Sequence, residues 1–434
     1  MKGIFNSLKE KIEKKEAKIC IIGLGYVGLP LASAFLKKGF FVYGLDTNVS
    51  RIRRIRKGIS YIVDVDFNLL LSFIKKNKFF PTTKKEILSS ADIIIICVPT
   101  PLKKVKIPDI SYIIQAASTI KEHLKKGQLI ILESTSYPTT TKDVVLPILK
   151  KSGLNEEEFF LCFSPERVNP GDKKFKLEDI PKLVGGINKE STDLAKLLYS
   201  QIIKKVYPVS TPEIAETAKL LENTFRLVNI ALVNEFALLC NKLGVDIWEV
   251  IKAAKTKPFG FMAFWPGPGI GGECIPQDPL YLSWKAKKIG FKTKMIDLAS
   301  FINHYMPKHV VNRVLKLLGE RKITLKKAKI LILGVTYKED VKDLRESPAL
   351  EIIEEFKKRK IKVDYFDPLI PYLKIGSLNM RRIKFSLSKI SEYDCIIIVT
   401  AHTNIDYEEI QKKAKLIFDT RNVYDKKFEN VVRL

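Results

Sequence analysis

One cysteine of this chain stands in surroundings that suit nucleophilic chemistry. Cys274 lies in the glycine-rich segment GPGIGGECIPQD, residues 267–278. Asp278 followed by Pro279 is typical of an N-cap and a first-turn proline, so we predict a helix that starts there and continues to residue 290. Backbone N–H groups and the positive end of a helix near the sulfur favour thiolate over thiol. We therefore predict a catalytic nucleophile; the alternative is a free cysteine in a tight loop.

The other five cysteines lie inside apolar runs, where cysteine usually behaves as a small buried hydrophobe. They are Cys20, Cys97, Cys162, Cys240 and Cys395. The six cysteines have no paired spacing, and the first 16 residues mix lysine with glutamate, unlike a signal peptide. We therefore expect a reduced protein of the cytoplasm. Four histidines, none grouped with cysteines, predict no metal site, and no apolar stretch has the length of a membrane span.

The net charge of +27 raises the question of nucleic-acid binding. The densest basic cluster holds Arg51, Arg53, Arg54, Arg56 and Lys57. The other lysines are spread over the whole chain, and no nucleic-acid-binding module is recognisable, so we predict no nucleic-acid partner. A positive field of this kind still attracts a polyanionic small molecule such as a nucleotide diphosphate.

The order of elements near the amino terminus fits a dinucleotide-binding unit. A strand at residues 18–22 leads into GLGYVG, with Gly23, Gly25 and Gly28, and a helix and a second strand follow that ends on Asp46. Such glycines let a pyrophosphate approach the helix start, and an acid at this distance binds a ribose diol. The acid would repel a 2′-phosphate, so we predict NAD rather than NADP, although Arg51 lies nearby.

Three further apolar runs, at residues 93–98, 129–132 and 159–163, are typical of parallel strands buried on both faces. Polar residues follow each run, including Thr100, Ser134, Thr135, Glu166 and Arg167. Ligands of open α/β sheets bind at the carboxyl ends of the strands, so we expect these residues to surround the cofactor. For the hydroxyl residues, ordinary loop chemistry is the alternative.

A long helix begins at Thr211 and Pro212 and ends near Gly244. Glu216, Lys219 and Asn223 share one of its faces, at spacings of three and four residues. Such a polar stripe is more often a solvated face than a site. Because the rest of the helix is mainly apolar, it is also a natural surface for a homodimer.

The segment KPFGFMAFWPGPG, residues 257–269, has no helical or strand period and is either a functional loop or an aromatic plug. From residue 329 the strand and helix alternation resumes, and its second strand ends on Asp367. This repeat predicts a second nucleotide-binding domain adapted to another ligand. The cations Lys338, Arg345 and Arg421 fall at its strand ends, where anionic groups should bind.

Together these motifs resemble the UDP-glucose/GDP-mannose dehydrogenase family, from GLGYVG through GVTYKEDVKDLRESPA to DTRN. The resemblance implies an α/β fold of two Rossmann-like doubly wound domains joined by a long central helix that pairs in a dimer. We predict an NAD-binding domain at residues 1–207, a central domain with the cysteine loop at residues 208–318, and a nucleotide-sugar domain at residues 319–434. The implied activity is oxidation of C6 of a nucleotide sugar to the uronate with two NAD, through a thiohemiacetal and a thioester on Cys274.

The resemblance also assigns residues. It implies Cys274 as nucleophile, with Lys219, Asn223 and Asp278 as its partners and Glu166 near the reacting sugar. The implied cofactor contacts are Gly23, Gly25, Gly28, Asp46, Arg51, Thr100, Thr135 and Arg345. The implied substrate contacts are Lys338 and Arg421, to which we add Glu166, Arg167, Lys219, Asn223, Phe259 and Gly271. The sequence leaves open whether Asp278 or Glu166 assists hydrolysis, and whether Lys219 steadies an oxyanion or relays protons.

The region around Cys274 is most similar to enzymes that act on UDP-N-acetylglucosamine, with UDP-glucose, UDP-N-acetylgalactosamine and GDP-mannose as alternatives. That subgroup usually has histidine before the cysteine, whereas this chain has Glu273. A carboxylate there would oppose thiolate formation unless it points away or is paired. Two other classes of protein are alternatives. The first is a two-electron 3-hydroxyacid dehydrogenase, which needs neither Cys274 nor a second nucleotide-binding domain. The second is a nucleic-acid-binding protein, which only the charge suggests.

Overall fold

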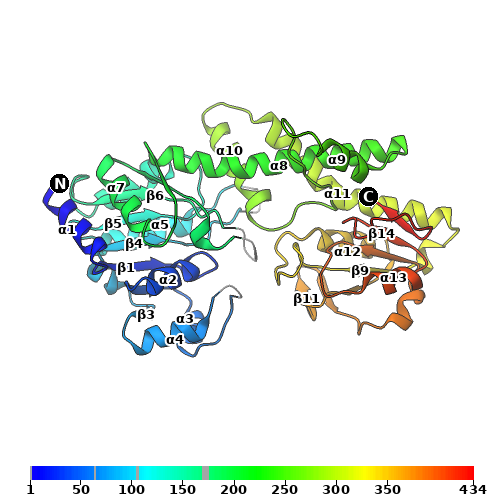
Figure 1. The fold of residues 1–434 in the computed structure, drawn as a ribbon, viewed down its shortest axis with the longest axis horizontal. Coiled ribbons are helices and arrows are strands. Elements are labelled where there is room, and N and C mark those ends of the chain that lie inside the picture. Colours follow the sequence, from blue (N-terminus) through cyan, green and yellow to red (C-terminus); the bar gives the residue numbers. More distant parts are fainter. Residues whose placement is uncertain (1, 63–64, 104–106, 169–174) are drawn as a thin grey trace. The chain divides into compact units, whose positions relative to one another are not determined.

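The computed structural model describes residues 2–62, 65–103, 107–168 and 175–434 (Figure 1). The chain forms two compact units. The first comprises Met1–Glu222 and Leu280–Gly290, and the second comprises Asn223–Pro279 and Phe291–Leu434.

The first unit is built on an eight-stranded sheet in the order β3-β2-β1-β4-β5-β6-β7-β8. All neighbouring strands are parallel except β6 and β7, which run antiparallel. The strands are β1 (Lys18–Ile22), β2 (Phe41–Leu45), β3 (Phe79–Thr82), β4 (Ile93–Ile96), β5 (Leu129–Leu132), β6 (Phe160–Phe163), β7 (Lys182–Gly186) and β8 (Val206–Val209). The predicted parallel strands at β4, β5 and β6 are confirmed.

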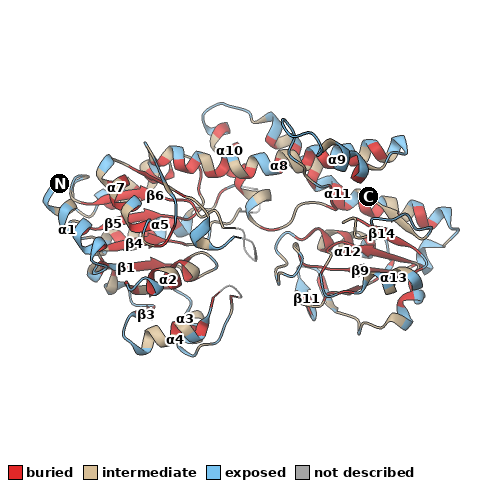
Figure 2. Cartoon of the chain, viewed as in Figure 1, coloured by how far each residue is buried: buried red, intermediate tan, exposed pale blue. Residues whose placement is uncertain are grey.

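Both faces of this sheet are buried, since alternate residues of its strands enter two different apolar clusters. In β4, Ile93 and Ile95 belong to one cluster and Ile94 and Ile96 to the other. This is why the central strands are continuous apolar runs without alternation. The central strands of the sheet are accordingly coloured as buried in Figure 2. The helical elements of the unit are α1 (Lys2–Glu13), α2 (Gly28–Lys37), α3 (Val49–Arg56), α4 (Phe67–Lys75), η1 (Lys85–Ser90), α5 (Ser111–His123), η2 (Thr141–Val145), α6 (Leu146–Lys150), η3 (Leu177–Asp179) and α7 (Lys189–Tyr199).

The second unit contains a five-stranded parallel sheet in the order β10-β9-β13-β14-β15 and a separate hairpin of β11 and β12. Its strands are β9 (Lys329–Leu333), β10 (Lys362–Phe366), β11 (Tyr372–Ile375), β12 (Leu378–Arg381), β13 (Cys395–Ile398), β14 (Ile417–Asp419) and β15 (Val431–Arg433). Its helical elements are α9 (Ile247–Ala254), α11 (Lys294–Glu320), η4 (Leu325–Lys327), α12 (Pro348–Lys358), η5 (Leu387–Glu392) and α13 (Tyr407–Lys413).

Helix α8 (Pro212–Leu243) is 32 residues long and carries the chain from the first unit into the second. The predicted fold class is therefore confirmed: an α/β protein with two Rossmann-like sheets and a long central helix. Within the part of the chain that the structure describes, no helix is both long and apolar enough to cross a membrane.

The predicted start of the helix after the cysteine loop is wrong. Helix α10 (Cys274–Lys288) begins at the cysteine itself, and Pro279 lies inside it. Only the first four N–H groups of a helix lack an intrahelical partner, and Pro279 is the sixth residue, so the helix forms here at the cost of one backbone hydrogen bond. The correction moves Cys274 from a loop to the first residue of the helix, at the positive end of its dipole.

The start of α8 is tied to the loop after β5 by a buried carboxylate. The Glu216 side chain accepts hydrogen bonds from the Thr139 N–H at 2.6 Å, the Thr141 N–H at 2.9 Å and the Thr141 hydroxyl at 2.7 Å. Glu216 is only 1% exposed. Burial raises its pKa to about 7, and these three donors only partly oppose that effect.

We predict that Glu216 makes the protein less stable as the pH rises. Its folded pKa lies above the unfolded value of 4.5, so the folded state binds the proton more tightly. This contribution is complete below about pH 4.5 and is lost as the pH rises through about 7, and it amounts to at most about 3 kcal/mol. Urea unfolding at pH 5 and pH 8 should therefore show a smaller pH dependence for Glu216→Gln than for the wild type. Glu235→Gln, at an exposed position of the same helix, is the control.

Candidate active site

The glycine turn after β1 has one open position and two closed ones. Gly23 has φ +93°, and a Cβ on it would lie 2.5 Å from the Cys97 carbonyl oxygen. A Cβ on Gly28 would lie 2.0 Å from the Gly23 carbonyl oxygen, whereas one on Gly25 would meet no atom within 4 Å. Gly23 and Gly28 thus let the chain pack closely, and Gly25 leaves free space at the start of α2, whose N-cap residue makes no side-chain cap bond. This arrangement fits a pyrophosphate and therefore fits NAD.

Asp46, at the end of β2, is nearly buried beside this turn. It accepts hydrogen bonds from the Leu24 and Asn48 N–H groups, each at 2.8 Å, and from the Arg51 guanidinium at 2.7 Å. The carboxylate is thus fixed at the position where the fingerprint acid binds a ribose. Arg51, which was predicted as a cofactor contact, lies in direct contact with it.

Arginines of the basic cluster on α3 make contacts within the first unit. Arg51 pairs with Asp46, Arg54 donates to the Ser60 carbonyl, and Arg56 donates to the Pro81 carbonyl at 2.7 Å. Arg51 and Arg54 also lie over the Tyr61 ring, at 5.7 and 5.3 Å. These contacts account for three of its arginines without a nucleic-acid ligand.

The hydroxyl residues that follow β4 and β5 lie at the same edge of the first sheet. The Ser134 hydroxyl donates to the Val98 carbonyl at 2.8 Å, which closes the two strand ends together. Thr100 is held through its carbonyl by the hydroxyl of Tyr281, from the second half of α10. Thr100 and Thr135 are both half-buried, so each keeps some accessible surface at this edge.

The segment after β6 brings Glu166 and Arg167 to α8. The Arg167 guanidinium makes a two-pronged contact with Glu222 of α8, at 3.1 and 2.7 Å. Lys219 lies one turn earlier on the same helix, and its positive charge favours the ionised form of Glu166. The structure thus brings together three predicted site residues: Glu166, Arg167 and Lys219.

The interpretation of Glu216, Lys219 and Asn223 as a solvated stripe is wrong. They are 1%, 7% and 5% exposed. Asn223 donates from Nδ2 to the Asp278 carboxylate at 2.5 Å. Asp278 lies one turn after Cys274 on α10, so the two share a face of that helix. The predicted partners Asn223 and Asp278 therefore meet, on the helix that begins at the exposed Cys274.

The loop before Cys274 needs its glycines because it packs on Tyr337. A Cβ on Gly271 would lie 2.4 Å from the Tyr337 Cβ, and one on Gly272 would lie 2.9 Å from the Tyr337 ring. Gly272 also has φ +81° and donates its N–H to the Arg345 carbonyl at 2.9 Å. The structure therefore gives Gly271, a predicted substrate contact, a packing role against the segment that follows β9.

Glu273 is paired, which answers the question that the sequence raised. Its carboxylate forms an ion pair with the Arg345 guanidinium, which also binds Asp343. The hydrogen bonds that Arg345 donates to Asp343, together with the charges of both carboxylates, raise the pKa of Arg345. The negative charge beside Cys274 is thus largely compensated, and Arg345, a predicted cofactor contact, lies next to the cysteine loop.

The acid at the end of β10 cannot act as a ribose ligand. Asp367 is fully buried and accepts five hydrogen bonds, including two from the Val335 and Thr336 N–H groups and one from the His402 Nε2. Its counterpart in the first unit, Asp46, accepts three. The second sheet therefore repeats the topology of the first but fills the diol-binding position with its own groups.

Two predicted cations of the second unit, Arg421 and Lys338, are both half-buried. Arg421 is half-buried, and its guanidinium donates to the Val399 carbonyl at 2.7 Å and lies against Gly267. Burial lowers its pKa to about 10, so it stays charged at neutral pH. Lys338 is half-buried in the loop after β9. The structure places both at the carboxyl edge of the second sheet.

The aromatic loop combines both predicted roles. Phe264 packs on Phe225 of α8 and Trp265 stacks on Trp248 of α9, with ring centroids 5.7 and 5.8 Å apart. Phe259, a predicted substrate contact, is 70% exposed, with the Lys257 ammonium 4.9 Å from its ring. The second half of the loop is thus a plug and the first half is open.

Two buried asparagines that the sequence did not single out hold this loop. Asn234 of α8 accepts the Gly267 N–H at 2.9 Å and donates to Asn303 of α11 at 2.9 Å. Asn303 in turn donates to the Leu227 carbonyl at 3.1 Å. Asn234 is eleven residues beyond Asn223, three helical turns along one face, which is the signal that could have revealed it.

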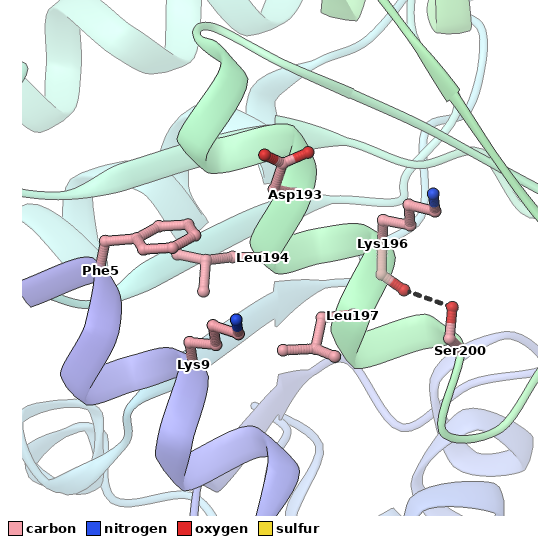
Figure 3. Close-up of a pocket in the computed structure, with 7 residues that line it drawn as sticks. All are labelled: Phe5, Lys9, Asp193, Leu194, Lys196, Leu197 and Ser200. Atoms are coloured by element: carbon pink, nitrogen blue, oxygen red, sulfur yellow. Dashed lines mark hydrogen bonds between the residues drawn. The ribbon is translucent and has the colours of Figure 1, made fainter. Parts of the chain in front are cut away.

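A separate groove of about 340 Å³ lies between α1 and α7 (Figure 3). Phe5, Leu194 and Leu197 supply its apolar lining, and Lys9, Asp193, Lys196 and Ser200 supply its polar lining. None of the predicted site residues lines it.

Comparisons with known proteins cover nearly the whole chain. Three models of the UDP-glucose/GDP-mannose dehydrogenase family match: the NAD binding domain at residues 17–203, the central domain at 213–305 and the UDP binding domain at 331–426. A UDP-N-acetyl-D-glucosamine 6-dehydrogenase of Pseudomonas aeruginosa is 37% identical over 95% of this chain and 98% of that protein. A UDP-N-acetyl-D-mannosamine dehydrogenase of Methanococcus maripaludis is also 37% identical, over 94% and 93%. The solved UDP-D-ManNAc dehydrogenase of Pyrococcus horikoshii superposes with a TM-score of 0.87 at 32% identity, covering 96% of this chain and 98% of that one.

We predict that alanine affects NAD binding at one glycine of the turn after β1 and fold stability at another. Gly25→Ala should leave thermal stability nearly unchanged but weaken NAD binding at least tenfold, because the new methyl group enters only the space where the pyrophosphate would lie. Gly28→Ala should destabilise the fold, because its Cβ meets backbone. Calorimetric titration with NAD and thermal melts distinguish the two; unchanged NAD affinity in Gly25→Ala would contradict the assignment.

Proposed function

Because the chain belongs to the UDP-glucose/GDP-mannose dehydrogenase family, we propose that it oxidises C6 of UDP-N-acetylglucosamine to the uronate. The family membership makes the protein an NAD-dependent oxidoreductase with a nucleotide-sugar substrate. The observation that carries the four-electron reaction is Cys274: it is exposed at the first residue of α10 and follows a glycine loop packed on Tyr337, in the segment after β9.

The choice of sugar rests on the similarity of residues 257–286 to enzymes acting on UDP-N-acetylglucosamine and on the Pseudomonas aeruginosa relative. UDP-N-acetylmannosamine is the second candidate, because a relative named as a UDP-N-acetyl-D-mannosamine dehydrogenase is also 37% identical. Both are UDP-N-acetylhexosamines that differ at C2. The similarity to these relatives therefore supports an N-acetyl group on the sugar more strongly than it supports one configuration at C2.

The residues that would hold NAD are those of the first turn. The N–H groups at the start of α2 and the open space at Gly25 would receive the pyrophosphate, and Asp46 would bind the adenosine ribose. Thr100 and Thr135 lie at the carboxyl ends of the strands, where the nicotinamide end is expected. When bound, NAD accepts a hydride from C6, once from the alcohol and once from the thiohemiacetal.

Cys274 supplies the covalent chemistry between the two oxidations. Its thiolate attacks the C6 aldehyde, and the carbonyl oxygen becomes the hydroxyl of a thiohemiacetal. Loss of the second hydride and of the hydroxyl proton leaves a thioester. Water then displaces the sulfur, which releases the uronate and restores the thiolate.

We assign the remaining roles from position. Lys219 would steady the oxygen at C6 as it gains negative charge, with Asn223 of the next turn fixing Asp278 in place. Asp278 shares a helix face with Cys274 and is the better candidate for activating the hydrolytic water. Glu166 would accept a hydrogen bond or proton from the sugar hydroxyl.

The second sheet would bind the UDP moiety. Lys338 and Arg421 supply positive charge at its carboxyl edge, and the filled position at Asp367 argues against a second dinucleotide there. We propose that residues 1–207 bind NAD, residues 208–318 carry the reacting groups and residues 319–434 bind the nucleotide. Arg167, Phe259 and Gly271 stay predicted substrate contacts.

We also propose a homodimer through α8. Four apolar side chains with helical spacing are between 46% and 65% exposed along its second half: Leu232, Phe236, Leu239 and Leu243. An exposed apolar stripe of this length suits a second copy of the same helix.

The function is tested by counting NADH. With UDP-N-acetylglucosamine, the wild type should form two NADH per sugar consumed, and UDP-N-acetylmannosamine, UDP-N-acetylgalactosamine, UDP-glucose and GDP-mannose complete the panel. Cys274→Ser should lower net uronate production by at least about a thousandfold, because an alkoxide is a poor substitute for a thiolate here. One NADH per sugar, or full uronate production by the serine variant, would support a two-electron dehydrogenase instead.

The dimer is tested by changing its centre. Leu232→Glu combined with Phe236→Glu should convert a dimer into a monomer, because charges in an apolar interface lose their hydration. Light scattering after gel filtration gives the mass, and Ile375→Glu, at an exposed apolar position on β11, is the control. A wild type that is already monomeric at micromolar concentration would refute the proposal.

A further inference from the structure

A buried lysine lies between two carboxylates at the carboxyl edge of the first sheet. The Lys182 ammonium is 3.0 Å from Glu133 Oε1 and 3.3 Å from Glu166 Oε2. The Lys182 side chain is 4% exposed, that of Glu133 is fully buried, and that of Glu166 is 16% exposed. Only Glu166 therefore reaches solvent, and it is the member of this triad with a predicted role at the sugar.

The antiparallel direction of β7 creates this contact. β7 pairs with the end of β6 through Phe163 and Gly185, so the chain enters β7 at the edge where the parallel strands end. Lys182, the first residue of β7, thereby comes beside Glu133 after β5 and Glu166 after β6. In a parallel strand the same lysine would lie at the opposite edge of the sheet.

Each of the three side chains, Lys182, Glu133 and Glu166, also contacts other groups of the protein. Glu133 Oε1 also accepts the hydroxyl of the buried Tyr199 of α7, and the Cys97 thiol lies 3.9 Å from Oε2. The Lys182 ammonium lies 5.1 Å from the Tyr199 ring. Glu166 Oε1 accepts the Arg167 and Val168 N–H groups at 2.7 and 2.6 Å. Lys182 is thus enclosed by protein groups and cannot itself contact a substrate.

The electrostatics of the triad are asymmetric. Burial raises the pKa of Glu133 and would also raise that of Glu166, but Lys182, the two backbone N–H groups and Lys219 outweigh it and hold the Glu166 pKa below its usual value. Burial alone would lower the pKa of Lys182, yet the two carboxylates raise it. Cys97 and Tyr199, which also face the triad, have pKa values raised by burial and stay neutral.

We propose that Lys182, anchored by Glu133 and Tyr199, is a positioning residue that keeps Glu166 ionised and aimed with its free lone pairs toward the substrate. The inference rests on the proposed function of Glu166. A buried cation at this distance favours the carboxylate, and the two N–H bonds fix its orientation. Glu166 then acts as a permanent acceptor for a sugar hydroxyl over the neutral pH range.

The test removes the cation without changing the charge of the triad. In Lys182→Met/Glu133→Gln, one positive and one negative charge are lost together, which buried pairs tolerate better than loss of one partner. Lys182→Met alone is the harsher variant, and Lys189→Met, from the exposed Lys189–Asp193 pair, is the control. Activity with UDP-N-acetylglucosamine and NAD is measured as kcat/KM from pH 5 to pH 9.

The double variant should shift the acidic limb of the kcat/KM profile upward by about one pH unit or more and recover activity at high pH, because Glu166 has lost its cation. The control should follow the wild type. A uniform loss of activity at every pH, or a lower melting temperature with an unchanged limb, would overturn the proposal, because either indicates a purely structural lysine.

A second measurement is independent of catalysis. Carbon NMR of protein labelled at the glutamate carboxyl carbons, with the Glu166 signal identified by its loss in Glu166→Gln, follows the titration directly. The Glu166 signal should titrate at higher pH in the double variant than in the wild type, and an unchanged midpoint would refute the role of Lys182. If the wild type oxidises no nucleotide sugar while this shift is observed, the proposed function fails and the electrostatic role of Lys182 stands.

Discussion

Polar groups buried along one helix must each find a partner, and this constraint shapes the candidate site. On α8, Glu216, Asn223 and Asn234 are all nearly or fully buried. Their partners are loop amides after β5, the carboxylate of Asp278, and the backbone of the aromatic loop at Gly267. Leaving any of these groups without a hydrogen bond would cost on the order of 1–3 kcal/mol. Buried side chains of the helix therefore fix these segments, to which we assign the proposed chemistry.

The two sheets show how one topology serves two ligands. Each has an acid after the second strand that accepts amides from the turn after the first strand. In the first unit the turn is a glycine fingerprint with open space at Gly25, whereas in the second unit His402 and four backbone amides occupy Asp367 completely. The difference lies in the side chains around the acid, and it separates a dinucleotide site from a site of another kind.

Local patterns predicted much of this structure. The glycine turn, the parallel strands, the limits of α8 and the burial of five cysteines all follow from residues close together in the sequence. Asp278 and Pro279 form a strong local helix signal, but α10 begins four residues earlier, at Cys274, directly after the glycines that pack on the distant Tyr337. The solvated interpretation of the α8 stripe failed for the same reason, since its partners lie far away in the sequence. The direction of β7, and with it the role of Lys182, depends on which edge of the sheet the chain enters.

The distribution of cysteines has a consequence for covalent ligands. Burial raises the pKa of Cys20, Cys97, Cys162 and Cys395 and hides their sulfur atoms, and Cys240 is buried as well, so Cys274 is the one exposed cysteine among the six, all of which the structure describes. Thiolate fraction and access govern how fast a cysteine reacts with an electrophile. Towards such reagents the folded chain should behave as a protein with a single accessible thiol. If the proposed site is correct, a small electrophile joined to a nucleotide would be directed to this position.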